Sequence, residues 1–251
     1  MVSRKGKTGL IDNVDQIAFD FAATPKIFTS PFASVSIQQD AESGVDGVLG
    51  PSKAKDDLVA SSIEELRAQT IQCRKCHLRD GCRGVVFGEG NPNAVIMFVG
   101  EGPGSVEDEL GRPFVGPAGQ LLDRILAAAG FKREEVYITN VVKCRPPNNR
   151  VPTPVEAVTC YPYLKSEISL VKPKILVCLG ATSLQTLVDP AARITRTRGT
   201  WFDKGDMKVI ATYHPAALLR DQSKKKPVWE DFIQIRRQYE KIIKSAGSRG
   251  A

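Results

Sequence analysis

Short apolar runs rich in β-branched residues recur along the chain, and they alternate with longer stretches whose apolar residues have helical spacing. The runs cover residues 94–99, 136–141, 175–179 and 208–211. The helical stretches cover residues 118–129, 155–170 (with a kink at Pro162), 181–188 and 229–243. Strands that alternate with helices predict a mainly parallel sheet covered on both faces. We therefore expect an α/β fold, a three-layer α/β/α arrangement around a central, mainly parallel four-stranded sheet.

The first sixty residues differ from the rest because they lack periodicity and are rich in Ser, Ala, Asp, Gly and Pro. Such a composition is typical of disordered segments. We expect residues 1–60 to form a disordered tail and residues 61–251 to form one domain that starts with a short helix. Residues 16–21, QIAFDF, are interpreted either as a docking motif for a partner such as a sliding clamp or as a chance apolar patch.

No apolar run approaches the roughly 18 residues that a membrane helix needs. The basic start of the chain is not followed by the apolar segment of about 7–15 residues that marks a secretory signal. We therefore expect a cytoplasmic protein without membrane contact, and a monomer by default.

The formal charge of +7 is unevenly distributed. Residues 1–60 carry 6 Lys or Arg against 8 Asp or Glu, whereas residues 61–251 carry 29 against 20. A basic domain suits a polyanion such as nucleic acid, although a solvated basic surface explains the same numbers.

The chemically distinctive residues follow the expected strands. The turn GEGPG occupies residues 100–104, Asn140 ends the second strand, Gly180 follows the third, and Tyr213-His214-Pro215 follows the fourth. Ligands of open α/β sheets bind beyond the carboxyl ends of the strands. The glycine-rich turn lacks the complete dinucleotide fingerprint and the Lys of a phosphate-binding loop. The sequence thus predicts a cleft without a nucleotide cofactor.

Three side chains near this cleft suit a pyrimidine. Phe114, in the loop GRPFVG, can stack on a flat base or simply anchor the loop. The amide of Asn140 can donate to O4 and accept from N3–H of uracil, a pairing that cytosine lacks, or it can tie a turn. His214 can donate to O2 of a departing uracil anion, or it can be structural.

Four carboxylates lie close together in the sequence, namely Glu101, Glu107, Asp108 and Glu109. Glu101, inside the rigid turn, is the best candidate to orient water or to balance a cationic sugar. Asp108 and Glu109 are expected to form a solvated first turn of a helix.

Six cysteines occupy positions 73, 76, 82, 144, 160 and 178. Disulfides are rare in cytosolic chains, and the Cys73-x-x-Cys76 pair indicates a metal or cluster site. Four thiolates suit zinc as well as an iron–sulfur cluster, so spacing leaves both open. Cys82 competes for a ligand role, and Cys178 is expected to be a small buried side chain.

Taken together, four strings resemble the family 4 uracil-DNA glycosylases, the iron–sulfur branch of their superfamily. They are GEGPG at 100–104, GRPFVGPAG at 111–119, TNVVKCRPP at 139–147 and YHPAALLR at 213–220. The resemblance covers about residues 65–245 and includes the cysteine spacing. It implies a DNA repair enzyme that hydrolyses the N-glycosidic bond of uracil in single- or double-stranded DNA and leaves an abasic site.

The resemblance also implies roles for individual residues. Phe114 would stack on the flipped uracil, Asn140 would recognise its polar edge and His214 would contact O2. Glu101 and Gly102 would surround the sugar and water, and Glu107 would exclude thymine. Leu218 and Leu219 would wedge into the duplex. A [4Fe–4S] cluster would be held by Cys73, Cys76, Cys144 and Cys160.

Two departures bear on this resemblance. Gly102 stands where the best-known relatives have an aspartate, which leaves water activation open, and Asn148 stands where the family often has glycine. The chain lacks the insertion with a reactive histidine that marks covalently trapping relatives, so hydrolysis with release is favoured. A sister glycosylase that also accepts hypoxanthine or mispaired thymine, and a non-catalytic nucleic-acid-binding protein, are the alternatives.

Overall fold

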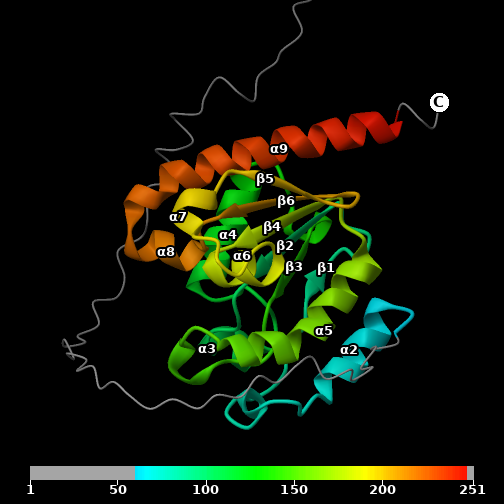
Figure 1. Cartoon of the computed structure of the whole chain (residues 1–251), viewed down its shortest axis with the longest axis vertical. Coiled ribbons are helices and arrows are strands. Elements are labelled where there is room, and N and C mark those ends of the chain that lie inside the picture. The colour runs from blue at the N-terminus through cyan, green and yellow to red at the C-terminus, as the bar shows by residue number, and fades with distance from the viewer. Residues whose placement is uncertain (1–59, 248–251) are drawn as a thin grey trace, which may run out of the picture.

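A computed structural model describes residues 60–247 and has helices on both faces of a central sheet, as expected (Figure 1). Helix α9 (Lys225–Gly247) runs along one side of the molecule, and α2 (Ile63–Ile71) lies at the opposite side. The expected tail, apart from its last residue, and the motif at residues 16–21 lie outside the described residues.

The sheet has six strands in the order β1-β3-β2-β4-β6-β5. Strands β2, β3, β4 and β6 are parallel and confirm the four expected strands, whereas β1 and β5 pair antiparallel at the two edges. The bounds are β1 Glu89–Gly90, β2 Ile96–Gly100, β3 Tyr137–Asn140, β4 Ile175–Leu179, β5 Trp201–Lys204 and β6 Met207–Thr212. The expected number of four is therefore wrong. Strand β1 is too short to show alternation, and β5 is a half-exposed hairpin partner of β6.

The remaining helices connect these strands. Their bounds are α3 Ser105–Leu110, α4 Pro117–Ala128, α5 Pro154–Val171, α6 Ala181–Leu187, α7 Ile194–Thr197 and α8 Pro215–Arg220, with short 3-10 turns at His77–Arg79, Arg133–Glu135, Pro147–Asn149 and Gln222–Lys224. The helical stretches expected from the sequence are confirmed, and α5 stays helical through Pro162. Within residues 60–247, no helix has the length and apolar character needed to cross a membrane.

Each face of the sheet carries its own apolar core. Alternate residues of β2 show this division: Ile96 and Phe98 pack with α4, α8 and α9, whereas Met97 and Val99 pack with α5 and α6. Successive side chains of a strand point to opposite faces, so a strand covered on both sides is apolar throughout. This is why β2 and β4 are continuous apolar runs.

The register of the parallel strands brings the distinctive residues together. Gly100 at the end of β2 lies opposite Asn140 at the end of β3, and Leu179 of β4 lies opposite Thr212 of β6. The four turns that follow these strands therefore meet at one edge of the sheet.

A buried ion pair joins α5 to the end of β3. Lys143 is 1% exposed and Glu167 is fully buried. The Nζ of Lys143 donates to the Glu167 carboxylate, to Thr139 Oγ1 (2.6 Å) and to the backbone oxygen of Asn140 (2.8 Å). Buried charges are tolerated when they are paired and hydrogen-bonded, and this network fixes the segment that follows β3.

Candidate active site

A cleft with a volume of about 560 Å³ opens at the carboxyl edge of the sheet. This volume lies within the range of small-molecule sites. The cleft collects all but one of the non-cysteine residues expected from the sequence, namely Glu101, Gly102, Glu107, Phe114, Asn140, Leu219 and His214. Leu218 is the exception.

Asn140 is 2% exposed, and its Oδ1 has no hydrogen-bond partner among the described residues. Buried polar atoms are nearly always paired, so a free acceptor in the lining of a cleft indicates a ligand that supplies the donor. Gly100 permits this arrangement. A Cβ at that position would lie 2.4 Å from Asn140 Oδ1 and 2.4 Å from Phe114 Cζ.

The ring of Phe114 lies beside the imidazole of His214, with centroids 5.5 Å apart and planes inclined by 32°. Phe114 has a φ of +53°, a left-handed backbone that bulky residues rarely adopt. Such strain concentrates at functional sites.

His214 is the N-cap of α8, and its Nδ1 accepts a hydrogen bond from the backbone N–H of Ala216 (3.2 Å). Burial, with a smaller contribution from Arg220, lowers the pKa of His214 from 6.5 to about 4. The ring is therefore neutral near pH 7. Because Nδ1 accepts, the proton is on Nε2, which remains available as a donor.

A residue that follows the neighbouring strand β4 fixes the side chain of Glu101. Thr182, in the first turn of α6, donates its hydroxyl proton to Glu101 Oε2. Thr182 is 8% exposed, and its contribution was not expected from the sequence. Only the register of β4 beside β2 brings residues 101 and 182 together.

Glu107 joins two turns of the cleft wall. Its Oε1 accepts from the backbone N–H groups of Val115 (3.0 Å) and Gly116 (2.7 Å), and its Oε2 accepts from that of Gly104 (3.2 Å). A carboxylate with three such bonds has a fixed orientation.

The two leucines that were expected to form a wedge differ in their exposure to solvent. Leu219 is 44% exposed and lines the cleft, whereas Leu218 is fully buried in the core formed with α4 and α9. A fully buried side chain offers no surface to a duplex, so the structure contradicts the expected role of Leu218.

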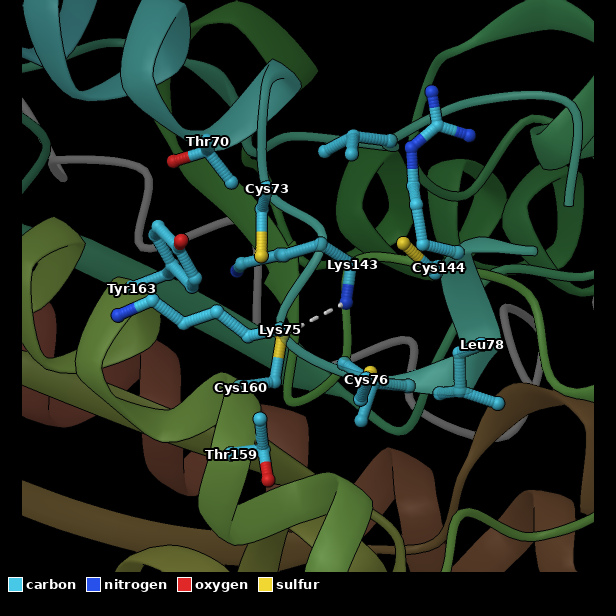
Figure 2. Close-up of a pocket in the computed structure, with 13 residues that line it drawn as sticks. Thr70, Cys73, Lys75, Cys76, Leu78, Lys143, Cys144, Thr159, Cys160 and Tyr163 are labelled. Carbon is cyan, nitrogen blue, oxygen red and sulfur yellow. Dashed lines mark hydrogen bonds between the residues drawn. The ribbon is translucent and has the colours of Figure 1, made fainter.

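A second pocket, separate from the cleft, is lined by the four cysteines expected to bind a cluster (Figure 2). Cys73 and Cys76 follow α2, Cys144 follows β3, and Cys160 belongs to α5. The backbone N–H of Lys143 donates to Cys160 Sγ (3.3 Å), the bond that is dashed in Figure 2. Cations also line this pocket, namely Lys75, Arg79 and Lys143.

Burial raises the pKa of Cys160 to about 11, and burial together with the nearby Cys82 raises the pKa of Cys144. Cys82 thus lies beside a cysteine of the pocket, and it also donates to the backbone oxygen of Arg79 (3.6 Å). Within residues 60–247, no three Cys, His, Asp or Glu side chains form a group placed to hold a single metal ion. Cys178 is fully buried in β4, as expected.

Two nearby residues refine the sequence interpretation. Asp108 is 6% exposed and accepts from the backbone N–H of Arg83 (2.9 Å), so the expectation that it is solvated is wrong. It ties α3 to the cysteine segment. Asn148 has a φ of +54°, the conformation that glycine adopts readily, so its loop keeps a glycine-like backbone.

Comparison with known proteins first identifies the class. The family model described as Uracil DNA glycosylase superfamily matches residues 87–233, more than half of the chain. The matched region contains Glu101, Phe114, Asn140 and His214, and it spans the whole cleft.

Individual relatives then indicate one branch of this superfamily. A type-4 uracil-DNA glycosylase of Thermotoga maritima is 51% identical over 163 residues, which are 64% of this chain and 85% of the relative. Those of Sulfurisphaera tokodaii and Archaeoglobus fulgidus are 45% and 43% identical over 184 residues, covering 70% and 69% of this chain and 84% and 92% of the relatives. The chain therefore belongs to the uracil-DNA glycosylase superfamily, in its type-4 branch.

The lowered pKa of His214 predicts a pH-dependent stability. The unfolded chain takes up this proton near pH 6.5 but the folded chain only near pH 4, so this contribution is complete above 6.5 and is lost as the pH falls toward 4. His214→Asn keeps a side chain that can cap α8 but removes the titration. We expect the melting temperature of the variant to fall less than that of the wild type between about pH 7 and about pH 5. An identical fall would contradict the assignment.

Proposed function

We propose that this chain hydrolyses the N-glycosidic bond between uracil and deoxyribose in DNA, so that it releases uracil and leaves an abasic site for base excision repair. The observation that carries the proposal is the buried Oδ1 of Asn140 in the wall of the cleft, which no donor of the described part of the chain reaches.

Recognition follows from the two atoms of the Asn140 amide. Oδ1 would accept from N3–H of uracil and Nδ2 would donate to O4. Cytosine presents a bare N3 and an amino group at these positions, so both pairings fail. Each buried polar group that is left unpaired costs about 1–3 kcal/mol, which is a sufficient basis for rejecting cytosine.

Access to the cleft requires that the nucleotide leave the base stack. Phe114 would stack on the flipped base, because its ring lies close both to the amide of Asn140 and to the imidazole of His214. Leu219, at the exposed rim, would fill the space left in the duplex. Leu218 has no part in this role because its side chain is fully buried.

Bond cleavage sends the electron pair of the C1′–N1 bond to the base. The Nε2–H of His214 would donate to O2 and stabilise the uracil anion, and preorganised donors of this kind contribute about 3–4 kcal/mol. Water would add its oxygen to C1′, and its proton would neutralise the departing base. Glu101, oriented by Thr182, would balance the cationic sugar and align this water.

Two further positions shape this reaction. Gly102 has no carboxylate to act as a base, so electrostatic stabilisation by Glu101 and His214 would supply most of the rate. Glu107 would stand against C5 of the base and exclude the methyl group of thymine. Its three backbone hydrogen bonds support this role because they prevent the side chain from moving aside.

The substrate is DNA, and both single- and double-stranded forms are proposed. The cleft rim carries Arg150 and Arg220, which suit the flanking phosphates. We further propose that the protein is a monomer and that it acts in the cytoplasm, at the nucleoid. We propose that residues 61–251 form the catalytic domain and that the N-terminal tail docks on a protein partner.

Cys73, Cys76, Cys144 and Cys160 are proposed to hold a [4Fe–4S] cluster. The donor set supports it, because four soft thiol ligands share one pocket, and the neighbouring side chains of Lys75 and Arg79 would balance part of the charge of four thiolates. When bound, the cluster supplies a covalent cross-link among these segments, and no redox step is required. Lys143 and Asp108 would transmit that order to the cleft wall.

The activity is tested by uracil release from a labelled oligonucleotide that contains one uracil, read as alkaline cleavage at the abasic site. We expect cleavage with uracil but not with cytosine or thymine, and a loss of about 100-fold or more in Asn140→Ala, because two hydrogen bonds to the base disappear. Cleavage that is independent of Asn140 would refute the recognition scheme. Release of hypoxanthine or mispaired thymine would favour the broader sister activity, and DNA binding without release would favour a binding protein.

The cluster is tested by colour and metal content of the purified protein. We expect a brown wild type that contains iron and sulfide, loss of both in Cys144→Ser, and retention in the matched variant Cys82→Ser, whose cysteine lies beside the pocket without being an assigned ligand. A colourless wild type that contains zinc would refute the cluster, and bleaching in Cys82→Ser would refute the ligand assignment.

A further inference from the structure

We propose that Arg133 is a positioning residue that holds the Phe114 loop in the conformation needed to stack on the flipped base. The proposal rests on the stacking role of Phe114 proposed above. Arg133 lies in the 3-10 turn Arg133–Glu135 that precedes β3, outside the lining of the cleft.

The loop requires an external support because its backbone is strained. Phe114 has a φ of +53°, and no glycine stands there to relieve it. The turn also packs tightly on α4. A Cβ at Gly119 would lie 2.0 Å from the carbonyl carbon of Phe114, so the backbone of the loop lies directly against α4 at this point.

Arg133 supplies the support on the carbonyl side of the loop. Its Nη2 donates to the backbone oxygen of Pro113 (2.6 Å), and its Nη1 donates to that of Phe114 (3.1 Å). One planar guanidinium therefore fixes two successive carbonyls and sets the direction of the peptide that carries the ring.

The guanidinium is itself held in place. Asp123 of α4 accepts from Nη1 (2.7 Å), Glu89 of β1 lies 3.8 Å from Nε, and the arginine side chain is only 23% exposed. Glu107 accepts from the next two backbone N–H groups of the loop, those of Val115 and Gly116. The Arg133 guanidinium thus binds the carbonyl oxygens of residues 113 and 114, and the Glu107 carboxylate binds the N–H groups of residues 115 and 116.

The consequence is specific to base binding. Without Arg133, Phe114 relaxes toward a negative φ, and its ring turns away from Asn140 and His214. The remaining cleft is unchanged, so the loss falls on KM for uracil-containing DNA more than on kcat.

The test compares Arg133→Met, Arg133→Lys and the control Arg112→Met by steady-state uracil release. Arg112 pairs with the same Glu89 (2.6 and 2.7 Å) but has no bond to the loop carbonyls in the described structure. We expect KM to rise about tenfold in Arg133→Met, a typical effect of losing one base–aromatic stack, and by less in Arg133→Lys, with kcat changed less than KM. The control should match the wild type. An unchanged KM in Arg133→Met, or an equal rise in the control, would overturn the proposal.

A double-mutant cycle separates positioning from general support. If Arg133 acts through Phe114, Arg133→Met adds nothing to KM in a Phe114→Ala background. Additive losses in the cycle would show that Arg133 acts by another route and would overturn the inference alone. If Phe114→Ala by itself leaves KM unchanged, stacking fails, and the inference falls with it. Should Arg133→Met fold poorly, Asp123→Asn loosens the same guanidinium and serves in the same cycle.

Discussion

The Oδ1 of Asn140 is buried at the end of β3 and has no hydrogen-bond partner within residues 60–247, and the proposed role of the cleft depends on that one atom. Such an atom costs the folded chain about 1–3 kcal/mol, so the fold must keep it from turning toward another donor or toward solvent. Two features do this. Gly100 leaves space for the amide and the Phe114 ring side by side, and Lys143 binds the backbone oxygen of Asn140. In the proposed reaction, the N3–H of uracil supplies the missing donor. A base without a donor at this position leaves Oδ1 unpaired and therefore binds more weakly.

The same strand end connects the two pockets. Lys143 uses its side chain to fix Asn140 and its backbone N–H to bind Cys160 Sγ, while the next residue, Cys144, lines the cysteine pocket. On the other side, Asp108 of α3 binds the backbone of residue 83 in the cysteine segment. A cluster bound by the four cysteines would therefore act as a structural cross-link whose effect reaches the cleft through the hydrogen bonds of Lys143 and Asp108. This explains why a cluster can matter to an enzyme whose chemistry needs no electron transfer.

Much of this arrangement was predictable because the buried strands are continuous apolar runs and the helices show clear periodicity. The cleft was also predictable, since parallel strands bring the residues that follow them to one edge. Strands β1 and β5 were missed because two residues, or a half-exposed hairpin, carry no distinctive pattern. Asp108 and Leu218 were misjudged for a related reason: both lie in short helices, α3 and α8, and only tertiary packing decides which side of a short helix is buried. Thr182 and Arg133 act through contacts with residues 81 and 19–20 positions away, and no local pattern indicates such contacts.

The central claim is that Asn140 reads the polar edge of uracil, and a crystal structure of the chain with free uracil tests it most directly. We expect uracil stacked on Phe114, with N3–H donated to Asn140 Oδ1, O4 accepting from Nδ2, and O2 within hydrogen-bond distance of His214 Nε2. Uracil bound in the cleft with Asn140 Oδ1 still unpaired, or bound away from Phe114 and His214, would contradict it.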